Sequence, residues 1–200
     1  MQAVQIEDDL SHRDQKRART HARIQQEGLR LFLERGFDAV TLDDVAAAAD
    51  VSRRTLFHYF PSKEAIALGF KADLGPRIAA AVARRPDGEG LLEMCEHALT
   101  DMAGDYQSAQ AKALAKLVHD TPALRGGDHA KYEEMERMLA DALARRGGLS
   151  VDPEQAHVVA VAAIGVLRQA TEAWLASGEP EGPEVHGKRL FTALRRAAGG

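Results

Sequence analysis

Cysteine, aromatic residues and long apolar runs are all scarce in this chain of 200 residues. Its single cysteine excludes an internal disulfide and is typical of a protein from a reducing compartment. No segment has the roughly 20 consecutive apolar residues of a membrane-spanning helix, and the N-terminus lacks an apolar stretch of the signal-peptide type. We therefore expect a soluble cytoplasmic protein with no membrane partner.

The composition favours helices over strands. Aromatic residues make up 5% of the chain and hydrophobic residues 45%, with alanine plentiful among them. Alanine has the highest helix propensity, whereas strands prefer branched and aromatic side chains. The length suits a small module plus a larger domain, or one elongated domain. We predict an all-α fold.

The net charge of -4 excludes a uniformly basic protein that coats nucleic acid. Any contact with DNA must therefore come from a local basic patch.

Residues 41–63, TLDDVAAAADVSRRTLFHYFPSK, predict two short helices joined by a tight turn. Thr41 is a favourable N-cap, and Asp44 stands where a capping box has its acidic residue. Asp50 occupies the turn, because Asp tolerates a left-handed backbone better than most residues. Ser52 caps the second helix, which ends before the following proline.

The spacing in this stretch predicts one buried and one polar face on the second helix. Ala46 is small enough to let the two helices touch, and Leu56 points back at that contact. The opposite face carries Arg53, Arg54, Thr55 and His58. Arginine near the start of a short helix suits the major groove, because its guanidinium matches the O6 and N7 acceptors of guanine. The alternative for the arginines alone is a solvated surface helix.

Residues 24–66 resemble the N-terminal DNA-binding domain of the TetR family of bacterial transcriptional regulators. The matching features are the Leu-Phe-x-Glu-Arg-Gly-Phe run, the threonine that opens the second helix, Ala46 before the turn, and Thr-Leu-Phe-His-Tyr-Phe-Pro-Ser-Lys-Glu. Two positions depart from the family pattern. Asp50 stands where the family usually has glycine, and Phe57 stands where it often has tyrosine.

The resemblance implies a ligand-responsive regulator, with an N-terminal helix-turn-helix domain and a larger helical domain for ligand binding and dimerisation. We expect a flexible tail at 1–12, the DNA-binding domain at 13–70 and the effector and dimerisation domain at 71–200. The regulator would be a homodimeric repressor that binds double-stranded DNA at a palindromic operator and is released by an unknown small molecule. Base reading is assigned to Arg53, Arg54 and Thr55, and phosphate positioning to Thr41, Ser52, His58, Tyr59 and Lys63.

A basic arm precedes the domain and consists of Arg13, Lys16, Arg17, Arg19 and Arg23. One interpretation is a solubilising helix end. The other is an arm that lies along phosphates or enters the minor groove.

Beyond a restart near Gly75 and the loop 86–90, the sequence predicts further helices over 91–106, 107–120, from Asp128 to the glycines at 147 and 148, over 153–177, and after the loop 178–183. The helix 153–177 is rich in Ala, Val and Ile, so it must be covered on more than one side. We expect a homodimer through the last two helices, the alternative being burial within one chain.

Candidate residues for an effector pocket in the larger domain are Met94, Met102, Tyr132, Met135, Met138 and Trp174. Methionine adapts to varied apolar shapes, but at helical spacing ordinary core packing is the more common role of any one of these residues. The Ala-rich helix and the segment 168–174 resemble those of family members that accept acyl-CoA-like effectors.

No catalytic motif is present: the sequence has no phosphate-binding glycine loop, no HExxH and no nucleophile elbow, so we expect no enzyme. We also expect no cofactor and no bound metal. A metal-responsive regulator of the same fold is the alternative, with Glu93, Cys95, Glu96 and His97 as its candidates, although only Glu93 and His97 share a helix face. A helical protein-interaction module without DNA binding is the third possibility.

Overall fold

The computed structural model describes residues 2–103, 108–147, 151–177 and 182–198, and all regular structure within these ranges is helical. The prediction of an all-α fold is therefore confirmed. The chain divides into two compact units, which are described separately. Unit 1 comprises Met1–Phe70 with Thr121–Leu124, and unit 2 comprises Lys71–Asp120 with Arg125–Gly200.

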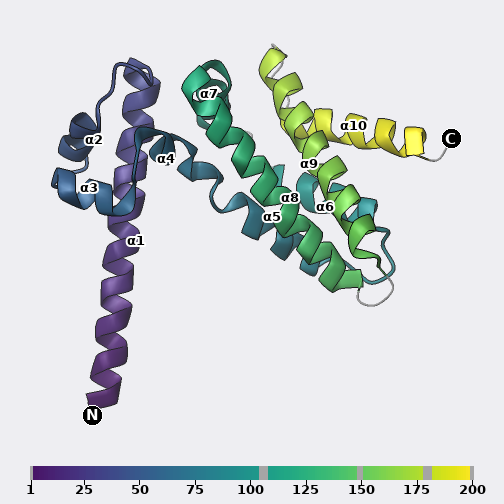
Figure 1. The fold of residues 1–200 in the computed structure, drawn as a ribbon, viewed down its shortest axis with the longest axis horizontal. Helices are drawn as coiled ribbons and strands as arrows, with labels where there is room; N and C mark the ends of the chain where they lie inside the picture. The colour runs from purple at the N-terminus through teal and green to yellow at the C-terminus, as the bar shows by residue number, and fades with distance from the viewer. Residues whose placement is uncertain (1, 104–107, 148–150, 178–181, 199–200) are drawn as a thin grey trace. The chain divides into compact units, whose positions relative to one another are not determined.

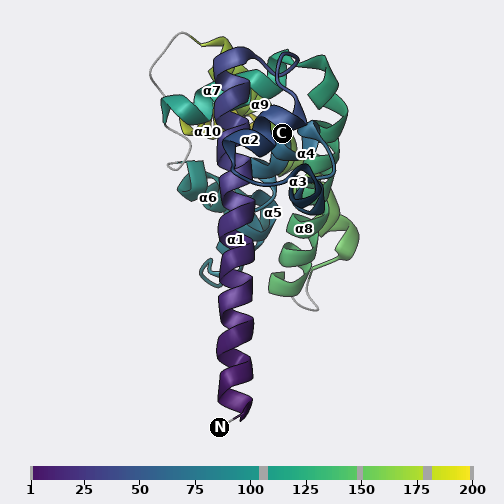
Figure 2. The same cartoon turned by 90° about the vertical axis from the view of Figure 1, so that its left-hand side faces the viewer.

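Unit 1 is built on one long helix. Its elements are α1 (Gln2–Arg35), α2 (Leu42–Ala48), α3 (Arg53–Tyr59), α4 (Lys63–Leu68) and the 3-10 turn η3 (Pro122–Leu124). Helix α1 packs against α2 and α4, and α2 packs against α3 (Figure 1). The N-terminal part of α1 extends beyond the three short helices in both views (Figure 2). Residues 2–12 continue this helix in place of the expected tail, because no proline or glycine interrupts them.

Two glycines set the geometry of α1. Gly36 has φ 83° and donates its N–H to the Phe32 carbonyl at 3.0 Å, so it ends the helix as the sequence predicts. The Phe37 ring beyond this cap packs 5.1 Å from the Phe32 ring. Gly28 lets α4 approach closely, since a Cβ there would lie 2.5 Å from Cγ2 of Ile66.

Unit 2 contains the remaining helices. They are α5 (Leu74–Ala83), α6 (Leu91–Ala103), α7 (Ala109–Asp120), α8 (Arg125–Gly147), α9 (Pro153–Ala176) and α10 (Pro183–Ala198), preceded by η1 (Gly69–Lys71). Helix α8 packs between α5 and α9, and α10 packs on α9 and α6. The core contains Met135, Leu139, Ile164 and Phe191, which are all buried. The expected junction at 106–107 lies outside the described residues.

The predicted start of α8 is wrong. Asp128 was expected to cap this helix, but α8 begins three residues earlier at Arg125 and includes two glycines in its first turn. Asp128 is instead the ion-pair partner of Lys71, whose Nζ lies 4.5 Å from the centroid of the Tyr132 ring. Because Lys71 is only 9% exposed, its charge needs a partner, and Asp128 provides one from the first turn.

Helix α9 begins as predicted and is apolar on two sides. The Asp152 side chain accepts the N–H of Glu154 at 2.9 Å, and Pro153 occupies the first turn. The inner face is buried against α6, α8 and α10. On the other side Val158 is 60% and Val161 41% exposed. By length and composition alone α9 could also cross a membrane, a test that core helices of soluble proteins pass as well.

Candidate nucleic-acid interface

The start of α2 is fixed by a reciprocal pair of hydrogen bonds. The Thr41 hydroxyl accepts the backbone N–H of Asp44 at 3.1 Å, and the Asp44 carboxylate accepts the N–H of Thr41 at 2.8 Å. This is the predicted capping box, and it satisfies two amides that the helix itself leaves unpaired. The hydrogen bonds from the hydroxyl and backbone of Thr41 lower the pKa of Asp44, because they stabilise its ionised carboxylate.

The turn between α2 and α3 has the predicted left-handed residue. Asp50 has φ 49°, the one positive φ of a non-glycine residue in the described ranges. Its carbonyl oxygen accepts a hydrogen bond from Nη2 of Arg23 at 3.5 Å, and the N–H of Val51 reaches the carbonyl of Ala46 at 3.0 Å. Helix α1 therefore helps to hold the turn that orients α3.

The buried side of α3 rests on Leu56, which is fully buried. At its start the Ser52 hydroxyl accepts the N–H of Thr55 at 3.1 Å, and the Ser52 and Thr55 hydroxyl oxygens lie 2.8 Å apart. Both hydroxyl groups therefore take part in the N-terminal cap of α3. Phe60, buried before the proline, ends the helix.

The outer side of α3 carries the two predicted base-reading arginines. Nη1 of Arg53 lies 2.9 Å from Oδ2 of Asp43, and both side chains are more than 60% exposed. The Arg53 guanidinium carbon also lies 5.6 Å from the Phe57 ring centroid. The exposed Arg54 side chain has no hydrogen-bond or ion-pair partner among the described residues. Arg54 is therefore free to donate hydrogen bonds to a base. Arg53 must first break its exposed ion pair with Asp43, which contributes little to stability.

A hollow of about 300 Å³ lies between α1 and α3. Its lining combines residues of α1 within the stretch 13–23, where the basic arm lies, with residues of α3, namely Asp14, Arg17, Ala18, His21, His58 and Tyr59. The His21 ring lies 4.4 Å from the Phe60 ring and 6.3 Å from the Tyr59 ring. The structure thus brings His58 and Tyr59, both predicted phosphate contacts, together with Arg17. Sequence reasoning missed His21, although it lies in the basic arm.

Lys63 has an intramolecular role that its position at the start of α4 did not reveal. Its Nζ donates to the carbonyl oxygens of Phe37 and Val40, each at 2.9 Å, and lies 4.5 Å from the Phe37 ring centroid. The ammonium group therefore ties α4 to the α1–α2 loop and has one N–H left for a phosphate.

The predicted effector-pocket residues occupy several environments in unit 2. Met94, Tyr132 and Met135 are packed in one hydrophobic cluster, and Met102 packs against it. A Cβ on Gly75 would lie 2.7 Å from the Met138 sulfur, so Met138 fills the space beside that glycine. Trp174 is buried, with Nζ of Lys112 5.4 Å from its ring centroid.

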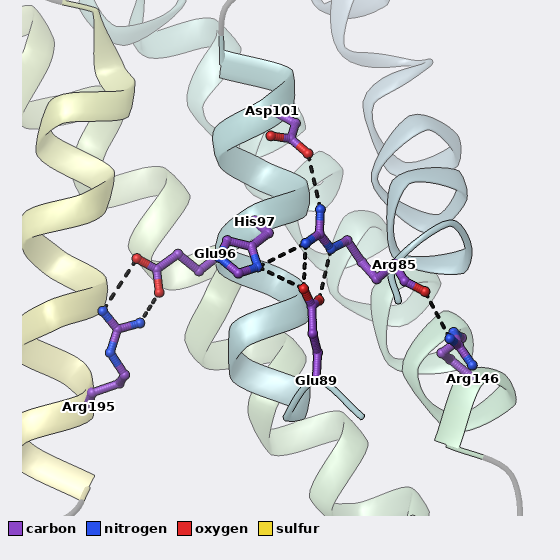
Figure 3. A network of polar contacts seen from close by, with 7 residues as sticks. All are labelled: Arg85, Glu89, Glu96, His97, Asp101, Arg146 and Arg195. Carbon is purple, nitrogen blue, oxygen red and sulfur yellow. Dashed lines mark hydrogen bonds and ion pairs between the residues drawn. The ribbon is translucent and has the colours of Figure 1, made fainter. Parts of the chain in front are cut away.

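A polar network joins the end of α5 to α6 (Figure 3). The Arg85 guanidinium forms two hydrogen bonds with Glu89, and Nδ1 of His97 lies 3.1 Å from both Glu89 Oε1 and Arg85 Nη2. The Arg85 hydrogen bond is the main reason that the pKa of Glu89 falls to about 2, with His97 adding to the effect. Arg85 Nη1 also reaches Asp101 at 3.4 Å.

The candidate metal ligands of α6 do not come together as one group. Glu96 pairs with Arg195 of α10, whereas His97 faces Arg85 and Glu89. Cys95 is buried, and desolvation raises the pKa of its thiol to about 12. Within the described part of the chain, no three His, Cys, Asp or Glu side chains are grouped so that they could hold a metal ion.

Comparison with known proteins assigns both units to one kind of regulator. The family model for bacterial regulatory proteins of the tetR family matches residues 24–69, and the model for the MftR C-terminal domain matches residues 89–197. The chain belongs to the TetR family of bacterial transcriptional regulators. The resemblance of residues 24–66 is thereby confirmed, and it extends to most of the chain.

Individual TetR-family proteins are similar over most of the chain. The transcriptional regulator TcmR of Streptomyces glaucescens is 32% identical over 150 residues, which are 71% of this chain and 66% of TcmR. The repressor KstR of Rhodococcus jostii is 29% identical, covering 86% and 76% of the two chains. FadR of Thermus thermophilus, solved with lauroyl-CoA, shares the fold at a TM-score of 0.59 and 23% identity. The match covers 87% of this chain and 92% of FadR. This chain therefore spans about two thirds of TcmR, and more of the other two.

Proposed function

We propose that this TetR-family regulator is a cytoplasmic homodimeric repressor, which binds a palindromic operator through α3 and is released by a small-molecule effector. The observation that carries the proposal is the state of Arg54. Its guanidinium is exposed and has no partner among the described residues, on a helix whose opposite face is fully buried at Leu56. Such a helix can offer a bidentate donor to guanine without rearranging the fold.

The surroundings of Arg54 support a division of roles. Arg53 and Thr55 would read bases beside it, and His58, Tyr59 and the basic arm on α1 would hold phosphates at the hollow between the two helices. Thr41, Ser52 and Lys63 complete the proposed phosphate set. All three already form hydrogen bonds that stabilise the local backbone. Thr41 and Ser52 would keep the backbone amides at the helix starts in position for a phosphate, and Lys63 would offer the remaining N–H of its ammonium group.

The dimer proposal rests on α9. Val158 and Val161 are exposed on a helix whose inner face is buried, and a Cβ on Gly165 would meet no atom within 4 Å. An apolar surface of this kind suits an isologous contact with a second copy, in which α10, packed on α9, would take part. Two α3 helices would then face half-sites one turn of duplex apart.

The effector proposal draws on the relatives. KstR is named as a repressor and FadR as a repressor solved with lauroyl-CoA. We propose residues 13–70 as the DNA-binding domain and 71–200 as the effector and dimerisation domain, with no catalytic activity. A metal-responsive version has no supporting cluster in the described ranges.

Selection of bound sequences from a random DNA pool tests the proposal. The full-length protein should enrich an inverted repeat, and its affinity for that sequence should fall steeply with salt, since phosphate contacts release counterions. A protein-interaction module would show no salt-sensitive DNA affinity, and that result would reject the proposal.

Val161→Arg tests the dimer. A charge in the centre of an apolar contact should convert the protein to a monomer at micromolar concentration and weaken operator binding, because one half-site remains. Sedimentation measures the mass, and Gln110→Arg on the exposed side of α7, outside the proposed contact, is the matched charge control. A variant that remains dimeric would place the contact elsewhere.

A further inference from the structure

A hollow lined by arginines lies on unit 2 and is separate from every residue assigned above to an effector pocket except Met102. Its volume is about 500 Å³, within the range of sites for small molecules. The lining comes from α5, from the residues directly after it, and from the end of α6: Arg77, Ala80, Ala81, Arg84, Arg85, Asp101 and Met102.

The hollow follows from the sequence of α5. Arg77 and Arg84 are seven residues apart, so two helical turns place them on one face. Ala80 and Ala81 lie three and four residues after Arg77, on the same face and between the two arginines. Two long cationic side chains thus flank a stretch that bears only methyl groups.

The third arginine is held in a fixed position. Both ends of the Arg85 guanidinium are engaged, through Glu89 on one side and Asp101 on the other, and its backbone carbonyl accepts a hydrogen bond from Arg146 at 2.8 Å (Figure 3). The contact to Asp101 is the weak one, because it is 3.4 Å long and Asp101 is 70% exposed. An anion in the hollow could replace the Asp101 carboxylate at Nη1 of Arg85 without disturbing the bond to Glu89.

The lining has an excess of positive charge. Three guanidinium groups and the Asp101 carboxylate line the hollow, and Glu89, outside the lining, pairs with Arg85. The exposed Arg84 side chain has no partner among the residues that the structure describes. Arg84 and Arg85 also stand at the C-terminal end of α5, where cations offset the helix dipole. Arg84 can therefore offset the helix dipole and still donate to an anion in the hollow.

We propose that this hollow binds an organic anion, whose charged group lies between Arg84 and Arg85 and whose compact apolar part lies on Ala80, Ala81 and Met102. Asp101 competes with the anion for Arg85 and so sets its affinity. The inference rests on the proposed function only in naming this anion as the effector.

Fluorescence titration of the full-length protein with 1-anilinonaphthalene-8-sulfonate tests the site, and N-phenyl-1-naphthylamine, which lacks the sulfonate, is the neutral control probe. Arg84→Gln should weaken binding of the sulfonate about tenfold, as expected for loss of a charged hydrogen bond. Asp101→Asn should tighten it about threefold, because a competing exposed carboxylate is removed. Arg196→Gln, an exposed change on α10 outside the lining of the hollow, should leave it unchanged, and none of the variants should alter binding of the neutral probe.

Displacement of the probe by 1-naphthoate and by 1-naphthyl phosphate distinguishes a carboxylate from a phosphate ligand. Absence of sulfonate binding, failure of both anions to displace it, or equal affinities in the Arg84 and Asp101 variants would overturn the inference. Each variant is also titrated with the DNA enriched from the random pool. DNA binding without anion binding rejects the site alone, and anion binding without DNA binding rejects the proposed function alone.

Discussion

The two units hold their polar groups in different ways. In unit 1, the caps of α2, α3 and α4 each join residues three positions apart, such as Ser62 with Ala65. In unit 2, charged side chains join elements that are far apart in sequence: Lys71 pairs with Asp128, and Glu96 with Arg195. Unit 1 also has longer contacts, from Lys63 and Arg23, but these end on backbone carbonyl groups. The outer face of α3 therefore stays exposed and can meet a partner, whereas ion pairs between distant elements hold the helices of unit 2 together.

Leu56→Ala should have the largest effect, and it tests whether unit 1 depends on a buried contact beneath its exposed face. Leu56 is fully buried, so its truncation should reduce the free energy of unfolding by about 2–5 kcal/mol and abolish DNA binding at moderate temperature. Phe57→Ala, one position along on the exposed side, should cost less than about 1 kcal/mol. Urea unfolding followed by circular dichroism compares the two, and equal losses would contradict the placement of α3.

Lys71→Met tests the distant bonds of unit 2. The change leaves the Asp128 carboxylate without its ion-pair partner, so the free energy of unfolding should fall by about 1–3 kcal/mol. Lys116→Met is the matched control, because its pair with Asp120 is exposed and local and should contribute less than about 1 kcal/mol.

The double variant Lys71→Met/Asp128→Leu separates a lost ion pair from lost packing. It should recover part of the loss in the same urea experiment, since no uncompensated charge remains. A double variant that is as unstable as the sum of the single changes would show that the pair is not coupled.

Glu89→Gln should have the smallest effect, and one that depends on pH. Arg85 lowers the pKa of Glu89 from 4.5 to about 2 in the folded protein, so its contribution to stability is complete above pH 4.5 and is lost as the pH falls towards 2. The difference in free energy of unfolding between wild type and variant should therefore shrink between pH 4.5 and 2. Urea unfolding at several pH values measures it. Gln110→Ala, an exposed change on α7 that removes no ionisable group, should give a difference that stays constant with pH.

The same contrast explains how much could be predicted from sequence. The capping box of Thr41 and Asp44, the left-handed Asp50 and the glycine that ends α1 were all predicted, because each depends on neighbours within a few residues. Residues 2–12 differ: polar composition indicated a tail, but the absence of helix-breaking residues allowed α1 to continue.

The errors and omissions arise where the partner is distant in sequence. Asp128 was expected to cap a helix, since nothing near it in sequence reveals Lys71, 57 positions away. Likewise, the carbonyl groups that bind Lys63 lie 26 and 23 residues before it. The Arg85–Glu89 pair lies in the loop between α5 and α6, so the helical rule for residues four apart does not apply and gave no signal in the sequence.

The most direct test of the account is selection from a random DNA pool carried out in parallel with wild type and Arg54→Ala. The variant should fold normally, because the side chain is exposed and has no partner among the described residues. We predict that it loses the preference at one base pair of each half-site and binds the wild-type operator about 1–3 kcal/mol more weakly. An unchanged sequence preference at every position would contradict the claim that α3 presents this guanidinium to the base edges.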